Sequence, residues 1–169
     1  MRLSSCNTDK FQVVELLIVN HGGNMVREIY ENELSNLLDL YLHLHEKSIP
    51  ETTEHLLETW KSIMQDENHH IIVKVVEDKI VSSCVCVIIP NLTRNARPYA
   101  FVENVVTHAD FRGKGYATEC LSYAKEIAES MKCYKMMLLT GSKKETTFDF
   151  YRNAGYNNTD KTAFIQWIE

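Results

Sequence analysis

The sequence predicts one domain of mixed α/β fold, an α+β sandwich with the element order β-α-α-β-β-β-α-β-α-β-β. Three observations lead to this prediction. The 169 residues correspond to about one domain of ordinary size. Some segments repeat apolar residues with a helical period, whereas others are β-branched runs. Hairpin patterns fill the first half of the chain, and strand–helix–strand patterns follow in the second half.

The first half alternates one strand, two helices and a hairpin. A short strand is expected at 26–30, and leucines at helical spacing predict a helix over 34–45. A second amphipathic helix is expected over 51–65. The β-branched runs 71–76 and 80–89 then predict two strands joined by a tight turn.

The second half begins with a strand expected at 99–107 and a glycine-containing loop. An amphipathic helix over 117–131 follows, because its apolar residues form one stripe. A strand at 135–140 and a short helix at 146–154 come next. Two last strands, expected within 156–168, would close the sheet as a hairpin.

Composition excludes several classes of protein. Lysine and arginine number 18 against 23 aspartates and glutamates, which gives a formal charge of -5. A nucleic-acid partner is not expected, because such proteins normally carry a basic excess. The apolar run near the start is too short to span a bilayer, so we expect a cytoplasmic protein with no membrane partner. Four of the five cysteines lie in apolar patterns, which indicates reduced, buried thiols and no metal site.

Residues 1–24 are expected to be an N-terminal extension of a domain that covers 25–169. The peptide His21–Met25 can be encoded with GGAGG shortly before an ATG codon, which is the arrangement of a bacterial ribosome-binding site. Met25 is therefore the expected natural start. The alternative is that the apolar segment 11–19 adds a strand or helix to the domain.

The loop Phe111-Arg112-Gly113-Lys114-Gly115-Tyr116-Ala117 precedes the long amphipathic helix. A helix N-terminus carries unpaired backbone N–H groups and a partial positive charge, and glycines let an anion approach the backbone closely. Arg112 and Lys114 add positive charge. The segment therefore indicates a phosphate cradle, although its spacing fits neither the P-loop nor the dinucleotide-binding pattern. A plain turn with basic side chains is the alternative.

The pattern Arg112-x-x-Gly115-x-Ala117 resembles the Q/R-x-x-G-x-G/A signature of the GNAT superfamily of N-acetyltransferases. Glu103–His108 resembles the family's fourth strand, which carries a bulge and splays from the fifth strand. Phe150–Tyr156 resembles its F-Y-x-x-x-G-[FY] ending, and Met25–Glu28 resembles its first strand. The similarity covers about residues 25–169, and its strongest stretch, Asn91–Gly155, resembles a group of uncharacterised bacterial members.

The resemblance implies an N-acetyltransferase domain that moves an acetyl group from acetyl-CoA to a primary amine by direct attack. Lys144 stands where the family often has an asparagine that contacts the pantetheine arm, so it could instead meet a phosphate or solvent. The implied coenzyme contacts are Val105, Val106, Thr107, Arg112, Gly113, Lys114, Gly115, Tyr116, Ala117 and Lys144.

Glu103 is the expected general base, and Tyr151 is the expected donor of a proton to the leaving thiolate. Strand alternation predicts that Glu103 shares a face with Val105 and Thr107. The alternatives are a solvated strand carboxylate for Glu103 and a core aromatic for Tyr151, which lies three residues after Phe148.

The residues predicted to contact the acceptor are Tyr41 and His45 on the first helix and Arg97 before the coenzyme strand. The acceptor could be a small amine, an amino acid, an amino sugar or a protein lysine, and a homodimer is left open. The tripeptide 133–135 resembles glucosamine-phosphate acetyltransferases, but it is too short to assign a substrate. The alternative function is a non-catalytic module that binds acyl-CoA as a sensor or partner domain, which would need neither Glu103 nor Tyr151.

Overall fold

The computed structural model of the protein describes residues 23–44 and 46–168. The candidate residue His45 and the expected extension, apart from its last two residues, lie outside the described part. Among the described residues, no helix is both long and apolar enough to cross a bilayer.

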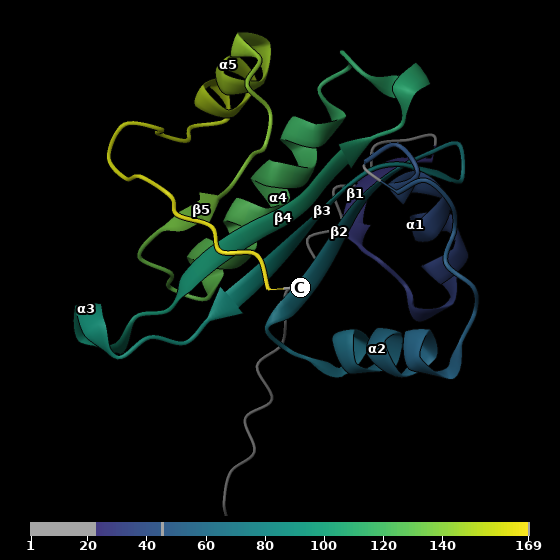
Figure 1. Ribbon diagram of the computed structural model, residues 1–169, viewed down its shortest axis with the longest axis horizontal. Coiled ribbons are helices and arrows are strands. Elements are labelled where there is room, and N and C mark those ends of the chain that lie inside the picture. The colour runs from purple at the N-terminus through teal and green to yellow at the C-terminus, as the bar shows by residue number, and fades with distance from the viewer. Residues whose placement is uncertain (1–22, 45, 169) are drawn as a thin grey trace, which may run out of the picture.

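The centre of the fold is a five-stranded mixed sheet with the spatial order β1-β2-β3-β4-β5 (Figure 1). The first four strands are antiparallel neighbours, whereas β4 and β5 are parallel. The parallel pair requires a crossover, and the helix between these two strands provides it. The strands are β1 (Asn24–Glu28), β2 (His69–Val76), β3 (Lys79–Ile89), β4 (Tyr99–Thr107) and β5 (Met136–Leu138).

Helices cover both faces of this sheet. In Figure 1, α1 and α2 lie at the right of the view, and α5 lies at the upper left beyond α4. The long helices are α1 (Leu34–Tyr41), α2 (Glu54–Gln65), α4 (Tyr116–Ser130) and α5 (Glu145–Asn153). Short turns are η1 (Glu31–Glu33), α3 (Thr93–Ala96) and η2 (Ala109–Phe111). The predicted mixed α/β fold is confirmed, with each helix and strand before residue 156 at its expected place in the order.

Strand alternation divides the core into two layers. On β3, Cys84 and Cys86 pack in the cluster that includes the apolar stripe of α4. Val85, between them, packs in the other cluster with Leu37 of α1 and Trp60 of α2. This period-2 pattern is what a strand buried on both faces requires. It also confirms that the cysteines of β3 are buried and free of disulfides.

The predicted hairpin within 156–168 is wrong, because no strand forms in these residues. The side chain of Asn157 accepts the N–H groups of Thr159 and Asp160, at 2.7 and 3.3 Å, and so turns the chain after α5. The edge that β5 offers to another strand is only three residues long. The segment 156–168 has a composition that favours strands, but no strand of adequate length pairs with it.

The feature that prepares a site is a bulge and a splay in β4. Glu103 pairs with Val85 and Val106 pairs with Ser83, so β4 holds one more residue than β3 between these pairs. Asn104, inside the bulge, has a φ of 51°. Beyond the bulge β4 has no pairing with β5, because that ladder covers only Ala100–Val102. The bulge and the splay implied by the resemblance are both confirmed.

Candidate active site

The open edge of β4 is the first component of the site. Beyond Val102 the backbone of residues 103–107 pairs with β3 on one side and with no described strand on the other. An unpaired strand edge presents N–H and C=O groups that can bind an extended ligand as a further strand would. An extended arm can therefore lie along Glu103–Thr107.

The second component is the N-terminus of α4, to which this edge leads. Gly115 caps the helix with a φ of 83° and no side-chain hydrogen bond, and Gly113 has a φ of 73°. These left-handed conformations favour glycine. The first helical bond runs from the N–H of Glu119 to the carbonyl of Gly115, so the N–H groups at 116–118 lack helical acceptors. A Cβ atom at Gly113 or Gly115 would meet no described atom within 4 Å, which leaves room for a bulky anion.

Arg112 fastens this loop to two other elements. Its Nε donates to the carbonyl of Thr107 at 3.1 Å, and its Nη2 donates to the carbonyl of His43 at 3.4 Å. Lys114 lies with its Nζ 4.8 Å from the ring centroid of Phe111. The two cations thus stay at the exposed loop that precedes α4, where they add to the positive end of the helix.

The position of Glu103 corrects one expectation. Glu103 pairs with Val85 and Thr107 pairs with Ser82, and these two residues of β3 lie on opposite faces. Val105 packs with the α4 cluster, whereas Val85 packs with the α1 and α2 cluster. Glu103 therefore lies on the opposite face from Val105 and Thr107, because the bulge resets the alternation. Its exposed carboxylate stands at the open edge, on the side of α1 and α2.

Tyr151 of α5 approaches the same edge from the α4 side, where it packs on the core. Burial raises the pKa of its hydroxyl, and the Cys84 thiol and the Glu103 carboxylate raise this pKa further. Tyr151 therefore keeps its proton at neutral pH. The charge of Glu103 is close enough to act on this hydroxyl, so the structure brings the two candidate catalytic residues together.

Tyr156, which was not among the predicted site residues, lies beside Tyr151. Its ring lies 6.1 Å from that of Tyr151, in an edge-to-face arrangement. Its hydroxyl oxygen is buried and has no hydrogen-bond partner among the described residues. Burial, followed by the thiols of Cys84 and Cys86, raises the pKa of Tyr156. The available signal was its place as the last residue of the Phe150–Tyr156 motif.

Tyr41 joins α1 to the bulge. Burial raises the pKa of Tyr41 to about 12, although the neighbouring side chain of Asn104 acts in the opposite direction. Tyr41 therefore lies beside the residue that follows Glu103, on the side expected for the acceptor. Since His45 lies outside the described residues, its predicted role remains a sequence-based expectation.

Arg97 lies apart from this constellation. The Arg97 guanidinium donates to the carbonyls of Lys132 and Cys133, at 3.1 and 3.0 Å, and so holds the end of α4 to the start of β4. Six residues of extended chain separate Arg97 from Glu103 by about 20 Å. No salt bridge between these two residues is present in the described part of the chain. Lys144 is exposed at the N-cap of α5.

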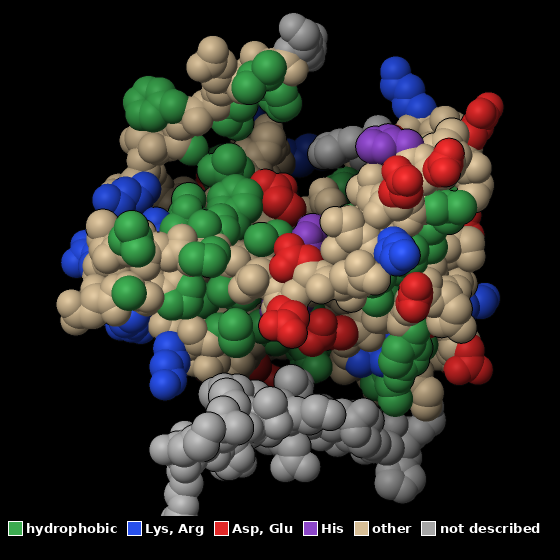
Figure 2. Space-filling model, turned by 90° about the horizontal axis from the view of Figure 1, so that it is seen from below, with side chains coloured by type: hydrophobic (Ala, Val, Ile, Leu, Met, Phe, Trp, Pro, Cys, Tyr) green, Lys and Arg blue, Asp and Glu red, His purple; other side chains and the backbone are tan. Residues whose placement is uncertain are grey.

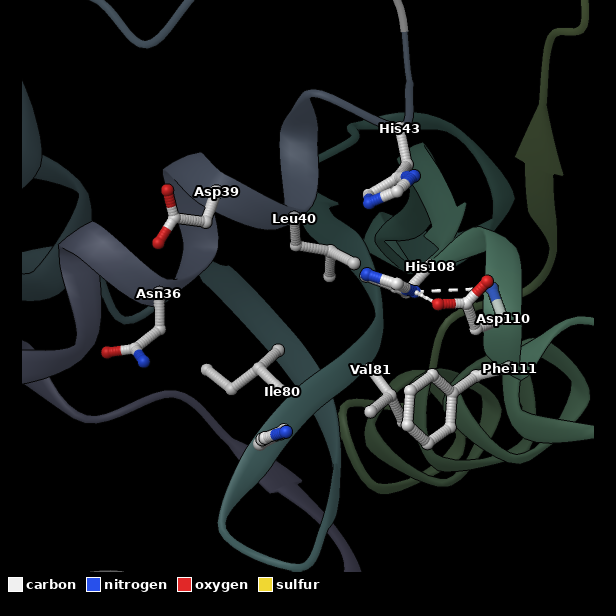
Figure 3. Close-up of a pocket in the computed structure, with 10 residues that line it drawn as sticks. Asn36, Asp39, Leu40, His43, Ile80, Val81, His108, Asp110 and Phe111 are labelled. Carbon is white, nitrogen blue, oxygen red and sulfur yellow. Dashed lines mark hydrogen bonds and ion pairs between the residues drawn. The ribbon is translucent and has the colours of Figure 1, made fainter.

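A cavity of about 500 Å³ lies on the other side of the loop before α4 (Figure 3). The rings of His43 and His108 are in contact on its wall, with centroids 4.1 Å apart. Asp39 on α1 and Asp110 after β4 add carboxylates to its wall. Neither Glu103 nor Tyr151 lines this cavity, so it is separate from the open edge of β4. In the described part of the chain, no cluster of three His, Cys, Asp or Glu side chains is arranged to hold a metal.

Comparison with known proteins identifies the family of this fold and site. Residues 34–156 match the Acetyltransferase (GNAT) family. The chain belongs to the GNAT family of acetyltransferases. It is also similar to the structure of a candidate acetyltransferase from Agrobacterium tumefaciens, with 35% identity and a TM-score of 0.79 over 85% of this chain and 99% of that chain.

Two further relatives of this GNAT protein have names that carry a substrate. A glucosamine 6-phosphate N-acetyltransferase of Trypanosoma brucei brucei is 32% identical over 78 residues, which are 46% of this chain and 51% of the relative. The chain thus aligns with about half the length of this curated relative. The structure of glucosamine-6-phosphate N-acetyltransferase from Arabidopsis thaliana has a TM-score of 0.75 over 86% of this chain and 99% of that chain. Its identity is 20%, so this likeness concerns the fold.

Family membership confirms the class of protein that the motifs predict, a GNAT acetyltransferase. Apart from Lys144, the residues predicted to contact the coenzyme lie along one continuous stretch from β4 into α4. Lys74 of β2 is the charged residue near this path that the reasoning missed. Its signal was a lysine inside the β-branched run 71–76.

Proposed function

We propose that the protein transfers an acetyl group from acetyl-CoA to a primary amine. The observation that supports this most directly is the continuity of the open β4 edge with the uncapped N-terminus of α4. A pantetheine arm paired with Glu103–Thr107 would deliver its diphosphate to the N–H groups at 116–118. The chain's own residues thereby hold the donor by backbone groups and by the charges of Arg112 and Lys114.

Glu103 and Tyr151 then flank the thioester from opposite faces. The amine approaches from the side of α1 and α2, and the Glu103 carboxylate takes its proton directly or through one water as the nitrogen attacks the carbonyl carbon. The carbon–sulfur bond breaks when the tetrahedral intermediate collapses. Tyr151, whose raised pKa keeps its hydroxyl protonated, donates a proton to the leaving thiolate.

The acceptor class that we propose to test first is an amino sugar phosphate. The support for it is the 32% identity with a glucosamine 6-phosphate N-acetyltransferase over about half of each chain. Tyr41 of α1 lies beside Asn104 of the bulge, on the side from which we expect the acceptor to approach. Small amines, amino acids and lysine peptides complete the set of acceptors.

The release of free thiol from acetyl-CoA tests this proposal. Purified protein is incubated with acetyl-CoA and each acceptor, and the thiol and the acetylated product are both measured. The expected result is thiol release that depends on the acceptor and equals the amide formed. Tight CoA binding with no transfer to any amine would instead support the acyl-CoA sensor, and absence of CoA binding would reject the coenzyme site.

A further inference from the structure

A buried lysine lies under the first turn of α4. Lys74 on β2 is only 4% exposed, in a strand whose neighbouring residues are apolar. Its ammonium group pairs with the carboxylate of Glu119, which lies in the first turn of α4. Its Nζ also lies 5.3 Å from the ring centroid of Tyr116, the first residue of that helix. A buried charge is costly unless it is paired, so the position of Lys74 needs a physical reason.

Lys74 begins a polar row that crosses three strands. Lys74 pairs with Ser82 of β3, and Ser82 pairs with Thr107 of β4. The hydroxyl of Ser82, which is fully buried, lies 2.8 Å from that of Thr107. The carbonyl of Thr107 in turn accepts the Nε of Arg112. The row therefore runs beneath the loop and the helix end that form the proposed diphosphate cradle.

Glu119 presents a difficulty for this cradle. An acidic side chain in the first turn stabilises a helix by itself, because it faces the positive end of the helix dipole. The same charge repels a diphosphate that binds at that end. Lys74 compensates this charge from the side of the sheet, and the Glu119 side chain remains 44% exposed.

We infer that Lys74 is a positioning residue for the coenzyme, which compensates Glu119 so that the N-terminus of α4 can accept the diphosphate of a coenzyme A thioester. This inference rests on the proposed function. It assigns to the Lys74–Glu119 pair the recognition of the phosphate-bearing part of the donor and no part in the acetyl transfer itself. The acetylated arm without phosphates should therefore not depend on the pair.

Calorimetric titration with CoA tests the inference in Lys74→Met. We expect CoA to bind about tenfold or more weakly, because the unpaired Glu119 carboxylate would then repel the diphosphate. The double variant Lys74→Met/Glu119→Gln should bind CoA within about threefold of the wild type, because both charges are absent. Lys125→Met is the matched control, since it removes a lysine from an exposed ion pair with Glu129 on α4 and should leave CoA affinity unchanged.

The kinetic readout compares acetyl-CoA with S-acetylpantetheine, which carries the same thioester arm without phosphates. Lys74→Met should raise KM for acetyl-CoA with little change in kcat, and should leave kcat/KM for S-acetylpantetheine within about twofold. Equal losses with both donors, unchanged CoA affinity, or a double variant as weak as the single one would overturn the inference.

If Lys74→Met does not fold, Lys74→Gln keeps a hydrogen-bond donor without charge and must show the same loss. A wild-type protein that binds no CoA would refute the proposed function, whereas CoA binding without transfer would leave the calorimetric test intact.

Discussion

Glu103 stands exposed at the open edge of β4, where the bulge turns it toward the layer of α1 and α2. A lysine-like amine has an unperturbed pKa near ~10.4, so little of it is a nucleophile at neutral pH without a base. Glu103→Gln keeps the shape of the side chain and removes the base. We expect kcat to fall by about 10²–10⁴-fold, with acetyl-CoA affinity nearly unchanged.

The pH profile separates this role from a structural one. The loss in Glu103→Gln should shrink as pH rises from 6 to 9, because more of the amine is already neutral. Glu58→Gln, an exposed carboxylate on α2, is the control and should keep full activity. Full activity of Glu103→Gln across this range would show that the carboxylate is dispensable.

At the level of single residues, the sequence predicts those features that depend on a local pattern. Gly113 and Gly115 predict a loop whose backbone an anion can approach closely, and their positive φ values are compatible with that prediction. The face of Glu103 was predicted wrongly, because one extra residue in β4 is defined only by its register with β3. The hydrogen-bond partner of Arg97 and the ion-pair partner of Lys74 could not be predicted either, because both lie far away in the sequence.

At the scale of single elements, the N-terminus of α4 can be tested with a matched pair of glycines. Gly115 and Gly155 have φ values of 83° and 91°, and a Cβ atom at either would meet nothing within 4 Å. Alanine at either position should therefore cost a similar backbone strain, about 1–2 kcal/mol. Only Gly115→Ala places a methyl group in the proposed cradle, so it should weaken CoA binding by about tenfold, which corresponds to about 1.4 kcal/mol.

Calorimetry and thermal unfolding of both variants check this expectation. Gly155→Ala serves as the control for strain, because Gly155 follows α5 and not α4. If the two variants lost CoA affinity equally, the effect would belong to stability and the diphosphate would not lie at Gly115.

Alkaline pH tests how α1 is held against the bulge of β4. Burial raises the pKa of Tyr41 to about 12, whereas an unfolded tyrosine titrates near ~10. Between these values the unfolded state binds fewer protons than the folded state, so the free energy of unfolding falls as pH rises. The part of this decline that Tyr41 contributes amounts to about 1 kcal/mol by pH 11.

Urea unfolding at pH 9 and pH 11, under reducing conditions, should show a smaller decline in Tyr41→Phe than in the wild type. An equal decline in both proteins would contradict the burial of this hydroxyl.

At the scale of the whole molecule, the end of the chain lies outside the two packed layers. Phe164, Trp167 and Ile168 are 93%, 81% and 94% exposed. Figure 2 shows hydrophobic side chains standing off from the body of the molecule at the top of the view. Such composition predicted a strand, but a strand forms only where another strand pairs with it. The sequence could therefore predict the sheet up to β5 and not the fate of this segment.

Deletion of residues 160–169 tests this arrangement. Because these exposed residues bury little apolar surface, the deletion should change the free energy of unfolding by less than about 1 kcal/mol. Urea unfolding measures the change, and sedimentation of both proteins measures their mass. A loss of several kcal/mol would mean that the segment packs on this chain. A lower molecular mass in sedimentation, beyond that of the deleted residues, would mean that it packs on a second copy.

We propose that coenzyme A lies along the open edge of β4, with its diphosphate at the N-terminus of α4. Amide hydrogen exchange with and without CoA tests it most directly, because both parts of the site consist of backbone N–H groups. Bound CoA should slow exchange at residues 103–107 and 115–118, with little change around the cavity lined by His43 and His108. Slower exchange confined to that cavity, with residues 103–107 and 115–118 unaffected, would contradict it.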